Sequence, residues 1–191
     1  MSKQVRTFIA VELSRAARQK LDKIKDTLRD CSLAVKWVEQ YNLHLTLKFL
    51  GSINQEKIET VKEELAEVAA DKTEFELQFE GLGAFPNLDY PKVVWAGVET
   101  GSRQLTELHE AIEERMTALG FDPERHSFTP HVTLGRVKKD EDNLEPLSEK
   151  LKEFPFQVDA RDEVTKITLM KSELTPRGPN YTPLAEFELS S

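Results

Sequence analysis

The sequence predicts an α+β fold in which two pseudo-symmetric lobes, each an antiparallel β-sheet with helices on its outer face, surround a central cleft. Segments with apolar residues at period 2, typical of strands, alternate with segments at period 3.6, typical of helices. The second half of the chain repeats the order of the first, and no low-complexity linker separates them. We therefore expect one bilobal domain over 1–191, with approximate repeat halves 5–80 and 92–160 and C-terminal strands within 164–189.

The first half reads as strand, helix, two strands, helix and strand. Period-2 alternation predicts the strands, which are Thr7–Glu12, Ala34–Val38, Leu43–Leu50 and Phe75–Phe79. Apolar stripes at helical spacing predict the helices; the stripes are Ala17, Leu21, Ile24 and Leu28, then Ile58, Val61, Leu65 and Val68. Ser14 can cap the first helix, and Ser52 or Asn54 can cap the second.

The second half follows a similar order. The expected strands are Lys92–Val98, a segment within Ser127–Arg136, and Phe154–Val158. The helical stripes are Leu105, Leu108, Ile112 and Leu119, then Leu144, Leu147 and Leu151. Val93 follows Thr7 by 86 residues and His131 follows His44 by 87, a nearly constant offset that indicates a repeat. Because any α+β chain alternates helices and strands, a fold without a repeat is the alternative.

The C-terminal part is expected to add strands at Val164–Leu174 and Leu184–Leu189. Two segments, Gly81–Pro91 and Thr175–Pro183, are rich in proline and glycine. Since these residues favour turns, we expect both segments to form loops within one compact body.

Composition excludes several classes of protein. The chain carries 26 basic and 34 acidic residues, a net charge of −8, which argues against a general basic surface for long nucleic acids or anionic membranes. A small basic pocket is compatible with this balance, and the 39% apolar share supports a real core. No run approaches the roughly 18 apolar residues of a membrane span, and no signal-peptide core follows the first residues. We expect a cytoplasmic protein that is a monomer.

Each half contains one distinctive tetrapeptide, and the two copies are His44-Leu45-Thr46-Leu47 and His131-Val132-Thr133-Leu134. Residues i and i+2 of a strand project from the same face, so each copy presents an imidazole beside a hydroxyl while the aliphatic residues anchor the other face. A single copy is most often a solvated strand face. Two copies among only four histidines, separated by the repeat offset, indicate a catalytic pair.

Two opposed imidazoles suit in-line displacement at phosphorus. One neutral histidine can remove a proton from an attacking water while one protonated histidine donates to the departing alkoxide. The threonine hydroxyls can hydrogen-bond the non-bridging phosphate oxygens between them. This chemistry requires no metal ion.

A metal site is the competing use of histidine, but the sequence lacks the usual ligand spacings HxH and HExxH. His126 is expected in a loop and His109 as a packing residue on a helix. Cys31 is the only cysteine, which excludes an internal disulfide and a cysteine-based zinc cluster; a buried packing thiol is its default role. We expect no metal and no cofactor.

Together with their surroundings, the motifs resemble those of the two-histidine phosphoesterases, a superfamily defined by paired HxTx motifs. The chain is most similar to its RNA 2′,3′-cyclic phosphodiesterases, formerly described as 2′-5′ RNA ligases, of bacteria and archaea, and the resemblance covers nearly the whole chain. The matching segments are Arg6–Ala10, Asn42–Gly51 (NLHLTLKFLG), Phe85-Pro86 with Val93–Val98, Phe128–Arg136 (FTPHVTLGR), and Ser172, Gly178 and Tyr181.

The resemblance implies hydrolysis of a terminal 2′,3′-cyclic phosphate on RNA to a 2′-phosphomonoester. It makes His44 the proton donor to the leaving 3′ oxygen and His131 the acceptor of a proton from water. It further implies that Thr46 and Thr133 bind phosphate oxygens and that Arg136 lies near the phosphate.

Alternation along the strands complicates the placement of the cations. Strict period 2 puts Gly135, not Arg136, on the face of His131, so Arg136 reaches the site only through a bulge or strand end near Gly135. A surface arginine is the alternative. Lys48 shares the face of His44 under strict alternation and is a second candidate for contacting phosphate.

Two aromatic residues and two other functions complete the expectations. Phe85 and Tyr181 can stack a terminal base, as aromatic residues do with single-stranded RNA, or pack as loop aromatics. The paired histidine motifs also fit a second reaction, the ATP-independent joining of a 2′,3′-cyclic end to a 5′-hydroxyl as a 2′-5′ bond, although bulk water favours hydrolysis. They also fit a non-catalytic module that binds phosphate or RNA ends, but binding alone needs no opposed acid and base.

Overall fold

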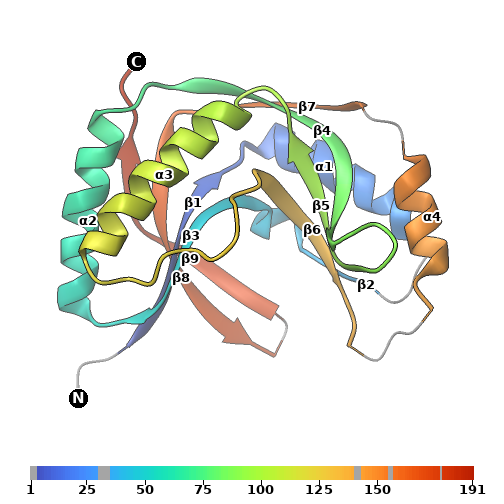
Figure 1. Cartoon of the computed structure of the whole chain (residues 1–191), viewed down its shortest axis with the longest axis horizontal. Coiled ribbons are helices and arrows are strands. Elements are labelled where there is room, and N and C mark those ends of the chain that lie inside the picture. The colour runs from blue at the N-terminus through green and yellow to red at the C-terminus, as the bar shows by residue number, and fades with distance from the viewer. Residues whose placement is uncertain (1–3, 30–34, 140–142, 155–156, 177) are drawn as a thin grey trace.

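The computed structural model describes residues 4–29, 35–139, 143–154, 157–176 and 178–191, which form one curled β-sheet flanked by helices (Figure 1). The strands are β1 (Val5–Glu12), β2 (Val35–Trp37), β3 (His44–Ile53), β4 (Phe75–Pro86), β5 (Pro91–Val98), β6 (His131–Val137), β7 (Gln157–Val164), β8 (Lys166–Thr175) and β9 (Gly178–Glu188). The helices are α1 (Arg15–Arg29), α2 (Gln55–Ala70), α3 (Ser102–Ala118) and α4 (Glu145–Glu153), with a short 3-10 turn, η1 (Gln40–Asn42). Cys31 lies outside the described residues. Within them, no helix is both long and apolar enough to cross a membrane.

The sheet consists of two lobes joined by a very short seam. Its strands follow the order β7-β4-β5-β6-β3-β1-β8-β9, with antiparallel neighbours throughout, and β2 also pairs with β6. Between β3 and β6 the pairing is a single residue pair, Leu45 with Val132. This seam divides the sheet into a first lobe of β1, β3, β8 and β9 and a second lobe of β2 and β4 to β7. The predicted α+β fold with two antiparallel lobes is confirmed.

The two halves of the sequence do not each fold into one lobe. β4, at the end of the first half, pairs with β5 and β7 in the second lobe. The helices are exchanged as well, since α1 packs against β7 of the second lobe and α3 packs against β3 of the first. Figure 1 shows α2 and α3 side by side near one end of the sheet and α4 near the other. Each lobe therefore depends on elements from both halves.

The first two helices form where the apolar spacing and the caps predict. The buried apolar residues of α1 are those of its predicted stripe: Ala17, Leu21, Ile24 and Leu28. Ser14 Oγ accepts a hydrogen bond from the Ala17 N–H at 3.2 Å, which stabilises the start of α1. For α2 the cap is Asn54 rather than Ser52, because Asn54 Oδ1 accepts from the Lys57 N–H at 2.8 Å.

Both segments predicted as loops are largely β-structure, so these two predictions were wrong. β4 continues past Gly81 to Pro86, with a β-bulge at Gly81, whose φ of 68° suits glycine. β9 begins at Gly178, immediately after its hairpin turn with β8. Its prolines are tolerated because β9 lies at the sheet edge, where half of the N–H groups need no strand partner.

Some predicted strand boundaries also differ from the structure. Of the strand predicted at Phe154–Val158, Phe154 caps the end of α4 and residues 155–156 lie outside the described residues. β7 covers Gln157–Val164, and β8 starts at Lys166. The position of β7 is set by its pairing with β4, from Phe75 to Glu80. Period-2 alternation within one segment does not contain this information, because the limits of a strand depend on the strand paired with it.

Candidate active site

The seam between the lobes places the two histidine motifs side by side. Leu45 and Val132, the residues directly after the histidines, are cross-strand partners. Residue numbers in an antiparallel ladder have a constant sum, so the register can be extended by one residue in each direction. It then gives two cross-strand pairs, His44 with Thr133 and Thr46 with His131. Because Leu45 and Val132 are buried, these polar side chains share the opposite face.

Each motif strand contains a β-bulge three residues after its histidine. In β3 the extra residue is Leu47, because its two neighbours pair with adjacent residues of β1. In β6 it is Leu134, whose neighbours pair with adjacent residues of β5. A bulge reverses the alternation of faces beyond it. Accordingly, the first six residues of β3 and β6 show the same order of half-buried, buried and exposed positions.

The bulge in β6 brings Arg136 to the site. Beyond Leu134, Gly135 turns to the buried side and Arg136 returns, exposed, to the face of His131. Arg136 lines the same cleft as His131. The bulge near Gly135 that this placement requires is therefore present.

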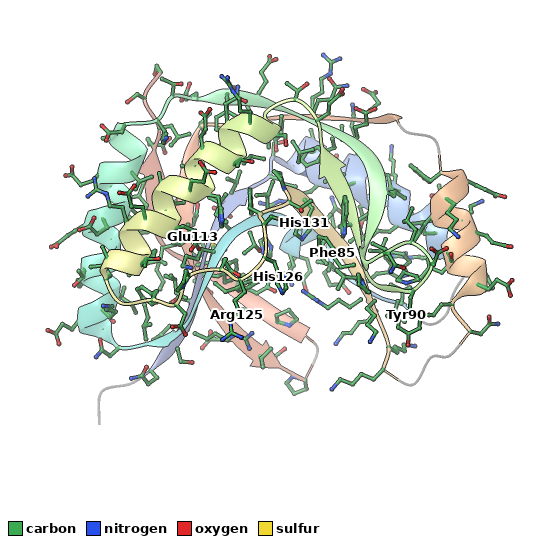
Figure 2. The ribbon with its side chains drawn as sticks, in the orientation of Figure 1. Phe85, Tyr90, Glu113, Arg125, His126 and His131 are labelled. Atoms are coloured by element: carbon green, nitrogen blue, oxygen red, sulfur yellow. The ribbon has the colours of Figure 1, made fainter. Side chains whose placement is uncertain are left out.

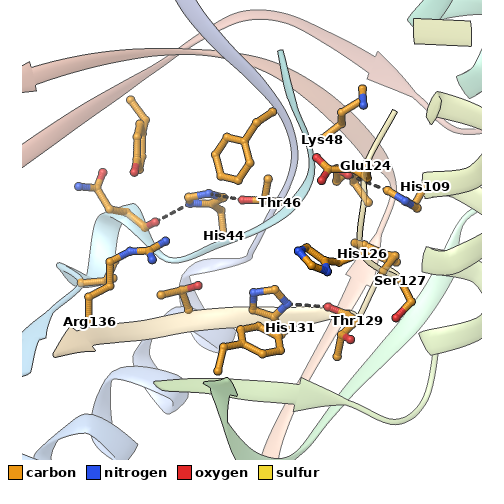
Figure 3. A pocket seen from close by; sticks show the side chains of 18 residues that line it. His44, Thr46, Lys48, His109, Glu124, His126, Ser127, Thr129, His131 and Arg136 are labelled. Atoms are coloured by element: carbon orange, nitrogen blue, oxygen red, sulfur yellow. Dashed lines mark hydrogen bonds between the residues drawn. The ribbon is translucent and has the colours of Figure 1, made fainter. Parts of the chain in front are cut away.

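The bulge in β3 has the opposite effect on Lys48. It moves this side chain off the face of His44, where strict alternation wrongly predicted it, and leaves it only 2% exposed. The Lys48 ammonium forms an ion pair with Glu113 of α3 and donates to the Asp122 carbonyl oxygen at 3.1 Å. Figure 3 shows Lys48 directed away from both histidines. Its charge is therefore already used within the protein.

One cleft of about 390 Å³ gathers the predicted site residues from both lobes (Figure 3). All eight line it: His44, Thr46, Lys48, Phe85, His131, Thr133, Arg136 and Tyr181. Phe85 comes from β4 and Tyr181 from β9, at opposite ends of the strand order. Figure 2 shows Phe85 and His131 close together, with Tyr90 farther out on the turn after β4.

Backbone carbonyl groups orient both imidazoles in the same way. His44 Nδ1 lies 2.7 Å from the Asn42 carbonyl oxygen, and His131 Nδ1 lies 2.5 Å from that of Thr129 (Figure 3). Because a carbonyl oxygen can only accept, each Nδ1 carries the proton of the neutral ring. Nε2 is then the nitrogen free to exchange a proton. His44 Nε2 lies 3.0 Å from Thr46 Oγ1, whose hydroxyl donates to it.

Aromatic rings enclose each histidine. The His44 ring is 5.0 Å from Phe8 and 5.2 Å, edge to face, from Tyr181. The His131 ring is 5.8 Å from Trp95 and 5.1 Å, edge to face, from Phe85.

Sequence reasoning missed Phe8 and Trp95 as site residues, although a signal for them was present. Their positions differ by 87 residues, the same offset as that between His44 and His131. Asn42 and Thr129 show the same offset, but side-chain patterns do not show where their carbonyl groups point.

Burial keeps both imidazoles neutral at pH 7. It lowers the pKa of His44 from 6.5 to about 4, against the opposing hydrogen bond to Asn42, while nearby Arg18 adds to the lowering. Burial also lowers the pKa of His131, again against its hydrogen bond to Thr129, and Arg136 contributes in the same direction as burial. An anion bound beside either ring would favour its protonated form.

Helix α3 connects the two motifs through its buried side. His109, which is 7% exposed, donates from Nδ1 to the carbonyl oxygen of the bulge residue Leu47 at 2.8 Å. Its ring stacks on Phe128 at 4.2 Å between centroids. Glu113, the partner of Lys48, also accepts from the N–H of Glu124 at 3.2 Å. These contacts fix the bulge of β3 against the loop that leads into β6.

The two remaining histidines match their predicted roles. His109 is a packing residue of a helix, and His126 is exposed in the loop before β6, where it lines the cleft. In the described parts of the chain, no group of three or more histidine, cysteine, aspartate or glutamate side chains is arranged to hold a metal ion.

Comparison with known sequences agrees with the residue pattern. The sequence profile of the 2′-5′ RNA ligase superfamily matches residues 13–176. A protein of Methanothermobacter thermautotrophicus, named RNA 2′,3′-cyclic phosphodiesterase, is 37% identical over 97% of this chain and 100% of its own length. A protein of the same name from Archaeoglobus fulgidus is 39% identical over 96% of this chain and 100% of its own.

Solved structures show the same architecture. A crystal structure from Thermus thermophilus superposes with a TM-score of 0.80 at 28% identity, covering 96% of this chain and 97% of the other. LigT of E. coli, crystallised with NADP+, superposes with a TM-score of 0.77 at 26% identity, covering 100% of both chains.

The buried position of Lys48 predicts that its charge serves stability, not anion binding. Lys48→Met leaves the Glu113 carboxylate without its partner, and we expect a loss of roughly 1–3 kcal/mol in the free energy of unfolding, measured in urea. The double variant Lys48→Met/Glu113→Gln should recover part of this loss. Lys152→Met, which breaks the exposed pair with Asp89, is the control and should cost less than about 1 kcal/mol. A stable Lys48→Met variant with weakened binding of inorganic phosphate would contradict the structural role.

The low pKa of His44 predicts a pH-dependent stability. An unfolded histidine titrates near 6.5 and folded His44 near 4, so between these values the unfolded state binds more protons. The free energy of unfolding should therefore fall as the pH falls through this window, by up to about 3 kcal/mol from this residue. Urea unfolding at several pH values measures the fall, and His44→Gln should reduce it. An NMR titration that places His44 near 6.5 would contradict the burial of its ring.

Proposed function

Because the chain belongs to the 2′-5′ RNA ligase superfamily, we propose that it hydrolyses 2′,3′-cyclic phosphate ends of RNA to 2′-phosphomonoesters. This is the activity of an RNA 2′,3′-cyclic phosphodiesterase, the name that its relatives carry. The observation that supports placing this activity in the cleft is the pair of imidazoles, His44 and His131. Both hold Nδ1 on a carbonyl group and leave Nε2 for proton exchange.

In the proposed reaction, His131 Nε2 takes a proton from water as the water oxygen attacks phosphorus. The bond between phosphorus and the 3′ oxygen breaks on the opposite side, and His44 Nε2 donates a proton to that oxygen. The product carries a 2′-phosphate and a 3′-hydroxyl. His131 ends protonated and His44 neutral, so both must exchange protons with solvent before the next turnover.

Substrate binding itself would supply the charge that His44 needs. Burial holds His44 neutral at pH 7, and a phosphate anion beside the ring favours its protonated form. The hydroxyl of Thr133, which projects from the same face as the histidines, is placed to donate to a non-bridging oxygen. The Thr46 hydroxyl can do the same once His44 is protonated, because Nε2 then no longer accepts its proton. Arg136, at the exposed end of the same face, would balance the phosphate charge.

The base of the terminal nucleotide would stack on Phe85 or Tyr181, since both rings line the cleft beside a histidine. We further propose that the enzyme is a monomer and that it acts in the cytoplasm. Joining of RNA ends is the same displacement with a 5′-hydroxyl in place of water as the nucleophile, and it remains a second candidate. Two poised Nε2 atoms argue against a module that only binds.

The first test of the function is product analysis with an oligoribonucleotide that ends in a 2′,3′-cyclic phosphate. We expect turnover to a 2′-phosphate in the presence of EDTA, because the two imidazoles supply both acid and base. Mass spectrometry shows the gain of one water, and chromatography against 2′-phosphate and 3′-phosphate standards identifies which isomer forms. Activity that disappears with EDTA and returns with one divalent metal would refute metal-independent catalysis, and a 3′-phosphate product would refute the assigned leaving oxygen.

The second test separates the acid from the base. His44→Ala and His131→Ala should each lower kcat by roughly 10²- to 10⁴-fold. A substrate whose 3′ leaving oxygen is replaced by a good leaving group needs no protonation, so it should restore His44→Ala but not His131→Ala. Rescue of His131→Ala instead would exchange the two roles. Full activity of both variants on the RNA substrate would remove the catalytic assignment.

A further inference from the structure

The pseudo-two-fold relation between the motif strands is broken at one exposed position beside the cleft. Positions 87 residues apart in the two motif strands correspond, so Phe49 of β3 matches Arg136 of β6. The two bulges turn both Phe49 and Arg136 to the face of the histidines. One rim of the cleft therefore carries a guanidinium group, and the equivalent rim carries an aromatic ring that is 58% exposed.

A second hollow begins at this aromatic rim. It has a volume of about 120 Å³, and Phe49 and Tyr181 line both it and the main cleft, so the two are adjacent. Its remaining walls come from β1, β3 and β8 and include Arg6, Phe8 and Ser172. At its edge, the space around Gly51 is open, with no atom within 4 Å of where a Cβ would be.

The hollow combines a cation, a hydroxyl and an exposed ring. Arg6 is exposed and forms no ion pair with any carboxylate in the described residues, yet its charge reaches Tyr181, where it opposes the rise in pKa that burial causes. An unpaired guanidinium beside a hydroxyl suits a phosphate group, and an exposed aromatic ring suits a nucleobase. Such a cation is notable on a chain with a net charge of −8.

The hollow lies on the His44 side of the site. The Phe49 ring is 6.0 Å from Phe8, and Phe8 is 5.0 Å from His44. In the proposed reaction His44 protonates the 3′ oxygen of the terminal nucleoside, so the RNA body must lie on this side and the attacking water on the side of His131. The strand that precedes the terminal nucleotide therefore leaves the cleft toward Phe49 and Arg6.

We propose that this hollow is a second nucleotide subsite, in which Arg6 and Ser172 bind the internucleotide phosphate and Phe49 stacks the penultimate base. The subsite rests on the proposed function and adds a substrate preference to it. The enzyme acts better on an RNA end of at least two nucleotides than on a cyclic mononucleotide.

The test compares a 2′,3′-cyclic mononucleotide with a dinucleotide that ends in the same cyclic nucleotide. Phe49→Ala should lower kcat/KM for the dinucleotide roughly 5- to 100-fold, the range for one lost base stack, and leave the mononucleotide within about two-fold. Phe49→Tyr should retain the preference for the dinucleotide, because it keeps a ring. Tyr90→Ala removes an aromatic ring of similar exposure that does not line either hollow, and it should change neither substrate.

Arg6→Gln separates the phosphate contact from the base contact. It should lower kcat/KM for the dinucleotide and weaken its salt dependence, whereas Arg103→Gln, at an exposed arginine on α3, should change neither. On a dinucleotide whose 5′ residue lacks its base, the Phe49→Ala effect should disappear and the Arg6→Gln effect should persist.

The outcomes distinguish the subsite from the function on which it rests. Equal losses on both substrates would place Phe49 and Arg6 in the central site, and equal wild-type kcat/KM values for the two substrates would exclude a second subsite. Either result overturns the inference and leaves the proposed function intact. Wild-type protein that hydrolyses neither substrate would refute the proposed function, and the subsite with it.

Discussion

The site depends on one backbone contact, the pairing of Leu45 with Val132 across the seam between the lobes. This pair follows each histidine directly, so the antiparallel register sets each imidazole opposite the threonine of the other motif. A shift of one residue would turn the motif of one strand into the core and its aliphatic residues into the cleft. Helix α1, from the first half of the chain, packs against β7 of the second lobe, and helix α3, from the second half, packs against β3 of the first lobe. Each lobe is therefore packed against a helix from the other half.

The two bulges are equivalent, and the different residues that follow them make the cleft chemically asymmetric. They place Leu47 and Leu134 as extra residues at equivalent points. Next to them, Lys48 has room to reach Glu113, whereas a Cβ on Gly135 would lie 2.5 Å from Val35 and 2.8 Å from Trp37 of β2. Only one motif strand has β2 packed on it, so the same backbone position needs glycine in one half and accepts lysine in the other.

Different features of this cleft set the orientation of the two imidazoles and their pKa values. Backbone carbonyl groups fix which nitrogen of each ring carries the proton, while burial among aromatic rings lowers both pKa values. The resting site thus offers two bases and no acid at pH 7. In the proposed reaction, the phosphate of the substrate would supply the negative charge that makes one of them an acid, so proton donation would depend on the presence of that anion.

The fold class, the repeat and the paired histidine motifs could be predicted from the sequence, because hydrophobic periodicity and residue spacing are local properties. The motif spacing together with the family resemblance named eight candidate site residues, and all of them line one cleft. The loop predictions at Gly81–Pro91 and Thr175–Pro183 failed because proline and glycine mark irregular backbone, which edge strands and bulges also contain.

The sequence by itself therefore determined which side chains are available to the cleft: two imidazoles, two hydroxyls, a guanidinium group and aromatic rings. Tertiary structure alone decided which of them face it. An extra residue in a strand is defined only relative to the strand paired with it. The reversal of faces that turns Arg136 toward the histidines and Lys48 away from them therefore requires β1 and β5 to be in place. The lowered pKa of His44 likewise arises from neighbours brought together from distant parts of the chain, such as Phe8 and Tyr181, whose burial of the ring no local pattern encodes.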